Sequence, residues 1–540
     1  SDPGSPRKVG FLPAEPNSYV GEGIHVIDYG QRDLLVHNNE TCDADRPVVS
    51  GFSLWDVTDP RSPVKLGQFG DTTPSVANQT FHTTHSVQAF AWRDRAYAVA
   101  QDNQDLKDVD IFDLTPVLRG EGPAALVAER GIEDWPGAQT TYANGDTVFH
   151  HDMQQQVIDG HNMLAVSYWD AGQVLLNIDD PANPVFVGDS DYLSPDPEFP
   201  SFGQAEGNSH QSYWDQDGDW LISTDEDFSP TRTLFEITEG QHAGQYGGGE
   251  FSWAKPIPEA GITSSGGTVF GGSGCPSDQN GNGTPDRGEV PSSASTGADT
   301  VVFSRGACFF SDKVRSGEDA GYRVVLIGQS HGGTRNGMLR DGFICGSQGS
   351  PTLGTAHAVC IGHRAMHLLF DDAPAYSPPE GYAAGGDLPA IGTRGANISA
   401  RPSFDGWGYV NLHDARSSDL PIVDTYAVAE SKDPAYRSGF GDLTVHEVKT
   451  DPRRGKDLAY LSYYNAGLRV AAFGPAGLQE VGHFIAEGGN DFWGVVPVCA
   501  GKCARNDRDK GRSRDDAKRP LLLMSDRDSG LWILRYTGKE

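Results

Sequence analysis

Four histidines occupy the same position of a repeated strand pattern. Each begins a short apolar strand, which is followed by a polar turn and by a second apolar strand that runs into an Asp/Asn-rich loop. The four repeat histidines are His85, His151, His210 and His446. Neutral imidazole is a common ligand of Cu, Fe, Zn and Ni, so four imidazoles at one place predict a transition-metal site. The alternative is a ring of hydrogen-bonded polar side chains that fills a channel without a metal.

The pattern of strands occurs six times, which predicts an all-β fold, a six-bladed β-propeller. One small antiparallel sheet cannot bury its faces until neighbouring copies pack around an axis. The expected blades span about 20–70, 85–130, 150–190, 208–250 continued at 405–430, 444–486 and 491–538. Seven blades are the alternative, because residues 130–148 could contain further strands. Since the innermost strand of each blade lines the axial channel, the repeat histidines should converge there.

The first and last blades differ from the others at the histidine position. The corresponding residues are Glu22 and Trp493, so one side of the channel is expected to lack an imidazole. The acidic loops should lie around the mouth of the channel, where they are candidates for binding substrate; solvated loop acids are the alternative. These rim candidates are Asp102, Asp170, Asp225, Asp227, Asp526 and Asp528, together with Trp493.

Four residues next to the repeat histidines are weighed separately. Asp152 and Glu447 directly follow two of the histidines. Because side chains alternate along a strand, both carboxylates should turn away from the channel and pack between blades. His82 and His150 precede the predicted ring and either join it or face solvent.

A domain-sized insertion interrupts the fourth blade, between the segments that begin at Leu234 and Trp407. Propeller blades are therefore expected at 7–250 and 405–538. The run from Ala298 through Cys308 to Ile327 is typical of a strand, an Arg-Gly-x-Cys turn, a helix and a second strand. Over residues 262–372 it resembles the protease-associated (PA) domain. That resemblance implies an inserted non-catalytic α+β module that binds partners or covers an active site.

A loop in the insertion has the spacing of a calcium-binding loop. Oxygen-bearing residues stand at loop positions 1, 3, 5, 7, 9 and 12, and Gly283 stands at position 6, where a sharp bend is needed. The predicted structural Ca²⁺ ligands are Asp278, Asn280, Asn282, Thr284, Asp286 and Glu289. A merely polar turn is the alternative.

Other segments resemble known families. The outer-hairpin runs Leu54-Trp-Asp-Val-Thr-Asp-Pro and Leu176-Asn-Ile-Asp-Asp-Pro, with Ser529-Gly-Leu-Trp-Ile-Leu, resemble the LVIVD-repeat family of secreted and surface propellers. The inner-strand histidines, as in Thr83-Thr-His85, are similar to the four-histidine iron site of carotenoid-cleaving oxygenases and to the copper-linked histidines of the selenium-binding/methanethiol oxidase propellers. The second similarity is an analogy at the level of the fold.

The composition of the chain limits the classes of molecule that the protein is expected to bind. The net charge of −32 at pH 7 argues against nucleic acid and anionic membrane surfaces, since both need a cationic face. No apolar run is long enough for a transmembrane helix. The seven cysteines are typical of disulfides in an exported protein, and the first residues are those expected of a mature N-terminus whose signal segment has been removed. The run Arg7-Lys-Val-Gly-Phe-Leu matches an outer strand and is expected to complete the last blade.

These observations predict a secreted or cell-surface metal-dependent enzyme with an oxidase or oxygenase type of redox activity. Cu or Fe is the expected metal, with Mn or Zn as alternatives. The ligand is a small molecule or an extracellular polymer or protein. The alternative function is a secreted binding protein without catalysis, whose propeller and insertion present surfaces to partners. No nucleophile elbow, phosphate-binding loop or dinucleotide fingerprint is present.

Overall fold

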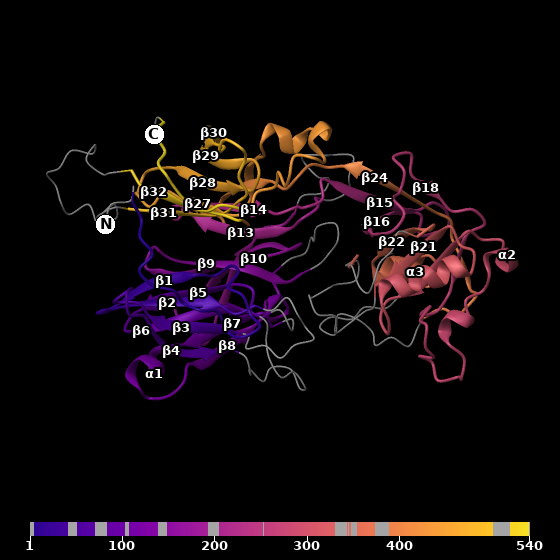
Figure 1. Ribbon diagram of the computed structural model, residues 1–540, viewed down its shortest axis with the longest axis horizontal. Helices are drawn as coiled ribbons and strands as arrows, with labels where there is room; N and C mark the ends of the chain where they lie inside the picture. Colours follow the sequence, from indigo (N-terminus) through magenta and orange to yellow (C-terminus); the bar gives the residue numbers. More distant parts are fainter. Residues whose placement is uncertain are drawn as a thin grey trace.

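The fold is a six-bladed β-propeller with a large insertion in its fourth blade (Figure 1). The computed structural model describes residues 5–40, 51–70, 84–102, 107–138, 148–192, 205–251, 253–329, 343, 345–346, 354–372, 388–499 and 519–538. In every blade the first strand along the chain is at one edge of its sheet, and the later strands follow outward.

The first three blades are continuous in sequence. Blade one contains β1 (His25–Tyr29), β2 (Arg32–Asn38), β3 (Phe52–Asp56) and β4 (Val64–Phe69). Blade two contains β5 (Val87–Trp92), β6 (Arg95–Gln101), β7 (Val109–Asp113) and β8 (Ala125–Arg130), with the short helix α1 (Thr115–Arg119) between its last two strands. Blade three contains β9 (His150–Ile158), β10 (His161–Tyr168), β11 (Gly172–Asn177) and β12 (Val185–Asp189).

Blade four is assembled from two distant segments. It contains β13 (Ser209–Trp214), β14 (Trp220–Asp225), β25 (Val410–Asp414) and β26 (Ile422–Tyr426). Blade five contains β27 (Val448–Thr450), β28 (Leu458–Tyr463), β29 (Gly467–Gly474) and β30 (Gly477–Phe484). Blade six contains β31 (Phe492–Val498), β32 (Leu521–Asp526) and β33 (Gly530–Leu534).

The insertion begins earlier than the sequence suggested. Strand β15 (Thr231–Ile237), expected in blade four, instead pairs with β24 (Ile398–Phe404) along its whole length. This antiparallel ribbon leads from the propeller to the insertion (Figure 1). Its sheet also holds β16 (Gly244–Tyr246) and β18 (Ile262–Thr263). The chain therefore leaves blade four after Asp225, because β14 pairs next with β25 and leaves no place for β15.

The second sheet of the insertion has mixed strand directions and is accompanied by helices. Its strands are β17 (Gly248–Glu250), β22 (His357–Ile361), β21 (Val324–Gly328), β20 (Thr300–Ser304), β19 (Thr268–Phe270) and β23 (Arg394–Gly395). Pairing is parallel from β19 through β20 and β21 to β22. The helices are α2 (Ser293–Thr296), α3 (Phe310–Asp319) and α4 (His363–Leu368). Two disulfides, Cys275–Cys308 and Cys345–Cys360, lie here, and Cys499 of the propeller is also disulfide-bonded.

Neighbouring blades share hydrophobic cores. In β10, Leu164 and Val166 pack with Val99 of blade two, whereas Ala165 packs with Trp214 of blade four. This alternation follows from the two-residue period of a strand. Similar clusters join blades one and two, four and five, and five and six. Since full burial of one Leu or Val contributes about 1.5–3 kcal/mol, each blade depends on its neighbours for stability.

Blade four also buries a histidine away from the axis. His413 is 2% exposed; its Nδ1 donates to the Leu420 carbonyl at 2.9 Å, and its Nε2 accepts from the Ser223 hydroxyl at 2.9 Å. Burial lowers the pKa of His413 to about 4. The side chain is therefore neutral at pH 7, with both ring nitrogens bonded.

The N-terminal segment does not complete the last blade. Residues 7–12 form no strand, and blade six has three strands within the described part of the chain. Instead, Glu15 forms an ion pair with Lys65 and accepts from the Ser53 hydroxyl, both in blade one. These polar contacts attach the segment to blade one. Residues 132–134 form a 3-10 helix where a seventh blade was considered.

No helix in the described ranges is long and apolar enough to cross a membrane; the longest, α3, has 10 residues.

Candidate metal centre

The repeat histidines converge, as predicted from their common position in the blades. His151 and His210 lie at the start of β9 and β13, whereas His85 and His446 lie two residues before β5 and β27. Hydrogen bonds from the backbone N–H groups hold the two histidines that precede their strands. His446 N–H donates to the Ser462 carbonyl at 2.8 Å, and His85 N–H donates to the Gln101 side-chain oxygen at 3.0 Å.

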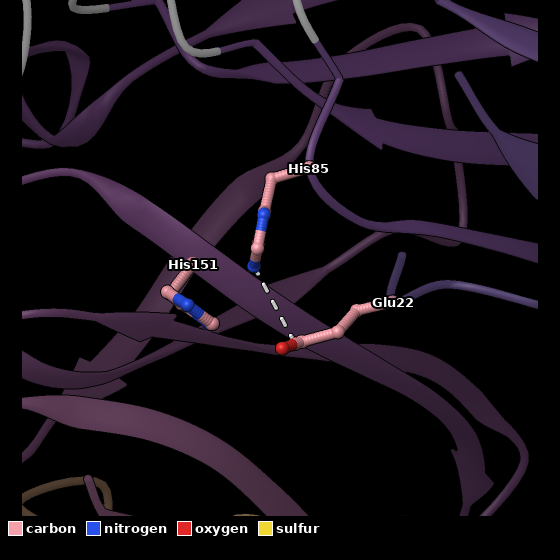
Figure 2. Close-up of side chains that lie close together, drawn as sticks. All are labelled: Glu22, His85 and His151. Atoms are coloured by element: carbon pink, nitrogen blue, oxygen red, sulfur yellow. Dashed lines mark ion pairs between the residues drawn. The ribbon is translucent and has the colours of Figure 1, made fainter. Parts of the chain in front are cut away.

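The four imidazoles form a chain of close contacts. Ring centroids are 4.5 Å apart between His85 and His151, 4.1 Å between His151 and His210, and 4.2 Å between His210 and His446. Glu22, which leads into β1, closes the group. We call these five residues the axial cluster. Figure 2 shows Glu22 facing His85 with His151 beside them.

Glu22 is the centre of the cluster's polar contacts. His446 Nε2 donates to Glu22 Oε1 at 2.9 Å. The Nε2 atoms of His85 and His210 each lie 3.5 Å from Glu22 Oε2. The sequence placed Glu22 at the histidine position of blade one, and the structure shows that its carboxylate joins the imidazoles there.

Several polar atoms of the axial cluster have no hydrogen bond to any described residue. They are the Nδ1 atoms of His151, His210 and His446. Glu22 Oε2 and the Nε2 atoms of His85 and His210 are held only by the 3.5 Å ion pairs among them. Buried polar atoms are normally satisfied, because an unmade hydrogen bond costs about 1–3 kcal/mol. The unpartnered nitrogens of the axial cluster therefore lie close together.

Charge interactions set the protonation of the cluster in the metal-free protein. Burial acts to raise the pKa of Glu22, but the three nearby imidazoles outweigh it and hold that pKa well below its usual range. Burial acts to lower the pKa of His210, but the carboxylates of Glu22 and Glu226 raise it to about 9. For His151, burial and the neighbouring imidazoles both lower the pKa well below 6.5. A metal would therefore have to displace protons, as binding to imidazole requires.

Two further carboxylates support the imidazoles, and the sequence analysis did not assign either. Both oxygens of Glu40 lie 3.0 Å from His85 Nδ1. Glu226 lies 3.7 Å from His210 Nε2 and accepts from the Tyr464 hydroxyl. Both glutamates follow a blade's second strand. The sequence analysis had marked the loop of Glu226 as acidic, but it had not marked the loop of Glu40.

Aromatic side chains surround the axial cluster. Trp169 packs against His151 with ring centroids 5.2 Å apart, and Trp493 packs against His446 at 5.4 Å. Trp493, a rim candidate in sequence, thus contacts the cluster from blade six. His85 is its most accessible imidazole, with 21% of the side chain exposed, although its Nε2 is buried.

The residues adjacent to the repeat histidines serve packing. Asp152 accepts from the Ser86 hydroxyl and the Gln211 amide, each at 2.6 Å, and Glu447 accepts from Val495 N–H at 3.1 Å. The prediction that both carboxylates pack between blades is confirmed. The adjacent His150 neither joins the cluster nor faces solvent. It is buried, and its Nδ1 bonds to the Asp108 carbonyl at 2.8 Å. His82 lies outside the described residues.

The acidic rim differs from the prediction. Asp528 is exposed, but Asp102, Asp170, Asp225, Asp227 and Asp526 are buried. Asp526 accepts from the N–H groups of its own turn, at Asp528 and Ser529, and Asp225 accepts from the Tyr192 hydroxyl and the Asn411 amide. Five of the six predicted rim acids are therefore buried, and Asp225 and Asp526 serve as acceptors for backbone and side-chain donors of the loops.

The predicted calcium loop is exposed and internally bonded. Asp278 accepts from Gly283 N–H at 2.7 Å, and Glu289 accepts from the Asn280 amide at 3.0 Å. Asp286 turns away: it is buried and accepts from the Ser273 hydroxyl and Gln279 N–H. Calcium binding by this loop stays a prediction.

Comparisons with known proteins do not place this chain in a family. No protein-family model and no curated protein matches it. Among solved structures, it is similar to a zinc aminopeptidase from Bacillus subtilis at 13% identity and a TM-score of 0.20, covering 36% of each chain. A novel alpha-L-arabinofuranosidase from Clostridium thermocellum matches at 12% identity and a TM-score of 0.28, over 42% of this chain and 71% of that one. A family 117 glycoside hydrolase from Zobellia galactanivorans matches at 11% identity and a TM-score of 0.27, over 43% and 68%.

The chain spans about a third of the length of the aminopeptidase, 36%. Such low TM-scores carry no argument about chemistry. The functional argument therefore depends on the axial cluster itself.

Proposed function

We propose that this protein is an exported metal-dependent propeller enzyme with a redox activity of the oxidase or oxygenase type, and that the axial cluster holds its transition metal. The observation that carries the proposal is the clustering of four imidazoles, three of which contact the carboxylate of Glu22, together with buried Nδ1 atoms of His151, His210 and His446 that make no hydrogen bond within the described residues. Imidazole with carboxylate suits Fe, Cu, Mn or Zn, and Cu or Fe would supply the redox chemistry.

The donor set fits such a metal. Glu22 with His85 and His151, and Glu22 with His210 and His446, each offer ligand atoms that lie within 4.8 Å of one another. In the proposal all four histidines are ligands, and Glu22 either completes the set or balances its charge. Ligating histidines usually donate their second ring N–H to a carboxylate or carbonyl, which fixes the ring's orientation. The Glu40 contact to His85 Nδ1 has this form. Trp169, Trp493 and the other surrounding rings limit the access of water, and the exposed side of His85 is where substrate would enter.

The competing function is that of a secreted binding protein. Its specific support is the bond from His446 to Glu22, with His85 and His210 nearby. The carboxylates near His85 and His210 raise the pKa of both imidazoles, so these two would be charged beside Glu22 and would fill the channel as a structural ion cluster. The propeller and the insertion would then act only through their surfaces.

Elemental analysis of protein purified without a His-tag separates these functions. We expect about one transition-metal ion per chain, and His151→Ala should lose most of it because an incomplete imidazole set binds at least about 10-fold more weakly. His150→Ala is the matched control. It removes an adjacent buried imidazole outside the axial cluster and should retain the metal. Native protein that takes up none of Cu, Fe, Mn or Zn after reconstitution would refute the enzyme proposal.

A further inference from the structure

A second group of carboxylates lies at the base of the ribbon that connects blade four to the insertion. Asp227 follows β14, just before the chain enters β15, and Asp405 follows β24, where the chain returns. Glu206 approaches from the segment before β13. Each of the three offers an oxygen, and these oxygens lie within 4.8 Å of one another. We call this group the junction triad.

The junction triad opens into a recess. The cavity has about 540 Å³ of empty volume, part of which is open to solvent, and all three carboxylates line it. Asp227 is 6% exposed and lines this cavity, and its Oδ2 receives no hydrogen bond from an N–H or hydroxyl donor of the described residues; its carboxyl is paired with that of Glu206. Its other oxygen accepts from Ser229 N–H at 2.7 Å. A buried carboxylate oxygen without a donor needs either a proton or a cation.

The charges at the recess do not balance. Arg232 donates to Asp405 and neutralises one carboxylate. Glu206 and Asp227 remain, so the ionised group would carry about two excess negative charges in a buried place. Burial raises the pKa of Glu206 and of Asp227 well above their usual range. Burying such charges without partners is costly, and a divalent cation would neutralise both.

We propose that the junction triad is a Ca²⁺ site, separate from the transition-metal centre. All its ligands are carboxylate oxygens. Hard cations such as Ca²⁺ and Mg²⁺ bind oxygen ligands, whereas Cu, Fe, Ni and Zn favour imidazole. Ca²⁺ binds oxygen at about 2.3–2.6 Å and tolerates irregular geometry, so one ion can span oxygens up to about 5 Å apart. Mg²⁺ needs shorter bonds and a near-ideal octahedron, which fits a wide triad less well.

A cation bound at the junction triad would hold the base of the ribbon together and fix the position of the neighbouring Glu226. Asp405 N–H donates to the Pro230 carbonyl at 3.3 Å, so the outgoing and returning chains already touch here. A cation bound to Glu206, Asp227 and Asp405 would join both strands of the ribbon to the segment that begins blade four. Asp227 also directly follows Glu226, which contacts the axial cluster. Ca²⁺ bound to Asp227 would therefore hold the segment 225–227, whose Glu226 carboxylate lies beside His210 of the axial cluster.

The test uses the full chain with the exposed loop disabled, because that loop is a second predicted Ca²⁺ site. In an Asp278→Asn/Glu289→Gln background stripped with chelator, titration with Ca²⁺ should show one ion per chain. Adding Asp227→Asn should weaken binding at least about 10-fold, since one of two uncompensated charges is lost. Asp215→Asn, at a buried turn in the same blade, is the matched control and should bind Ca²⁺ as the background does.

Thermal unfolding provides a second readout. Ca²⁺ at about 100 times its Kd should raise the Tm of the background by about 2 °C, and the Asp227→Asn variant should lose this shift. If that variant does not fold, Glu206→Gln replaces it. A folded background that binds no Ca²⁺, or that binds Mg²⁺ or Mn²⁺ in preference, would overturn the proposal. His151→Ala should keep the Ca²⁺ stoichiometry, so this result is independent of the proposed enzyme function.

Discussion

Replacing Glu40 tests how the proposed metal centre is supported, without removing a ligand. Both oxygens of Glu40 lie 3.0 Å from His85 Nδ1, so the carboxylate holds the ring proton on Nδ1. The other ring nitrogen, His85 Nε2, is directed toward Glu22 Oε2, 3.5 Å away. Glu40→Gln keeps the size and one acceptor oxygen but removes the charge.

The expected effect follows from the strength of that hydrogen bond. A bond to a charged group contributes about 1.5–3 kcal/mol and a neutral one about 0.5–1.5 kcal/mol. Glu40 is 14% exposed on its side chain, so solvent weakens the bond only in part. A loss of about 1–1.5 kcal/mol corresponds to roughly 10-fold weaker metal binding. Glu40→Ala should approach the 100-fold end of the range for residues that orient metal ligands.

The assay is competition between the protein and a chelator of known affinity, at fixed pH, with the metal found in the native protein. Glu447→Gln is the control: it neutralises a carboxylate that directly follows an axial histidine but packs against blade six. It should bind metal as the wild type does. If Glu40→Gln and Glu447→Gln both bind within about twofold of wild type, well inside the 10-fold effect expected of an orienting residue, then Glu40 has no role in orienting His85.

Three further predictions concern other parts of the protein. His413 has a pKa of about 4 when folded and about 6.5 when unfolded, so the unfolded chain binds more protons and the free energy of unfolding should fall by about 2 kcal/mol from pH 8 to pH 5. His413→Gln should remove this part of the slope in urea titrations, whereas the exposed His161→Gln should not; equal slopes would refute it. Chelator should increase proteolysis within residues 278–289, and in Glu289→Gln it should make no difference; an unchanged digest of wild type would contradict calcium binding there. Replacing Cys275 and Cys308 by Ser removes a disulfide that joins residues 33 positions apart, and it should lower the free energy of unfolding of the insertion by about 3–4 kcal/mol. The unfolding midpoint of the insertion measures this effect, and an unchanged midpoint would count against it.

The convergence of the four histidines could be predicted because it depends only on repetition. Residues at the same position of successive blades stand at the same level around one axis, so His85 and His446 could be brought together across more than 350 residues of sequence without knowing any contact. The interblade packing of Asp152 and Glu447 was predictable for the same kind of reason, the two-residue alternation of a strand.

The carboxylates were not predictable in this way. Glu40 and Glu226 come from loops, where no period fixes the direction of a side chain. The repeat marked the loop of Glu226 without showing which acid points to the axis, and it did not mark the loop of Glu40. The same limitation applies to Asp225 and Asp227, expected on an open rim and found buried.

Strand pattern alone also failed where several edges could accept the same strand. The run beginning at Arg7 matched an outer strand, but the segment lies along blade one, held through Glu15. Strand β15 matched blade four, yet it pairs with β24. Sequence determined the repeating fold and the level of each histidine, since both are periodic properties. Only the tertiary structure decided which edges pair and which carboxylates reach the axis or the junction, because these depend on competition among contacts that are distant in the chain.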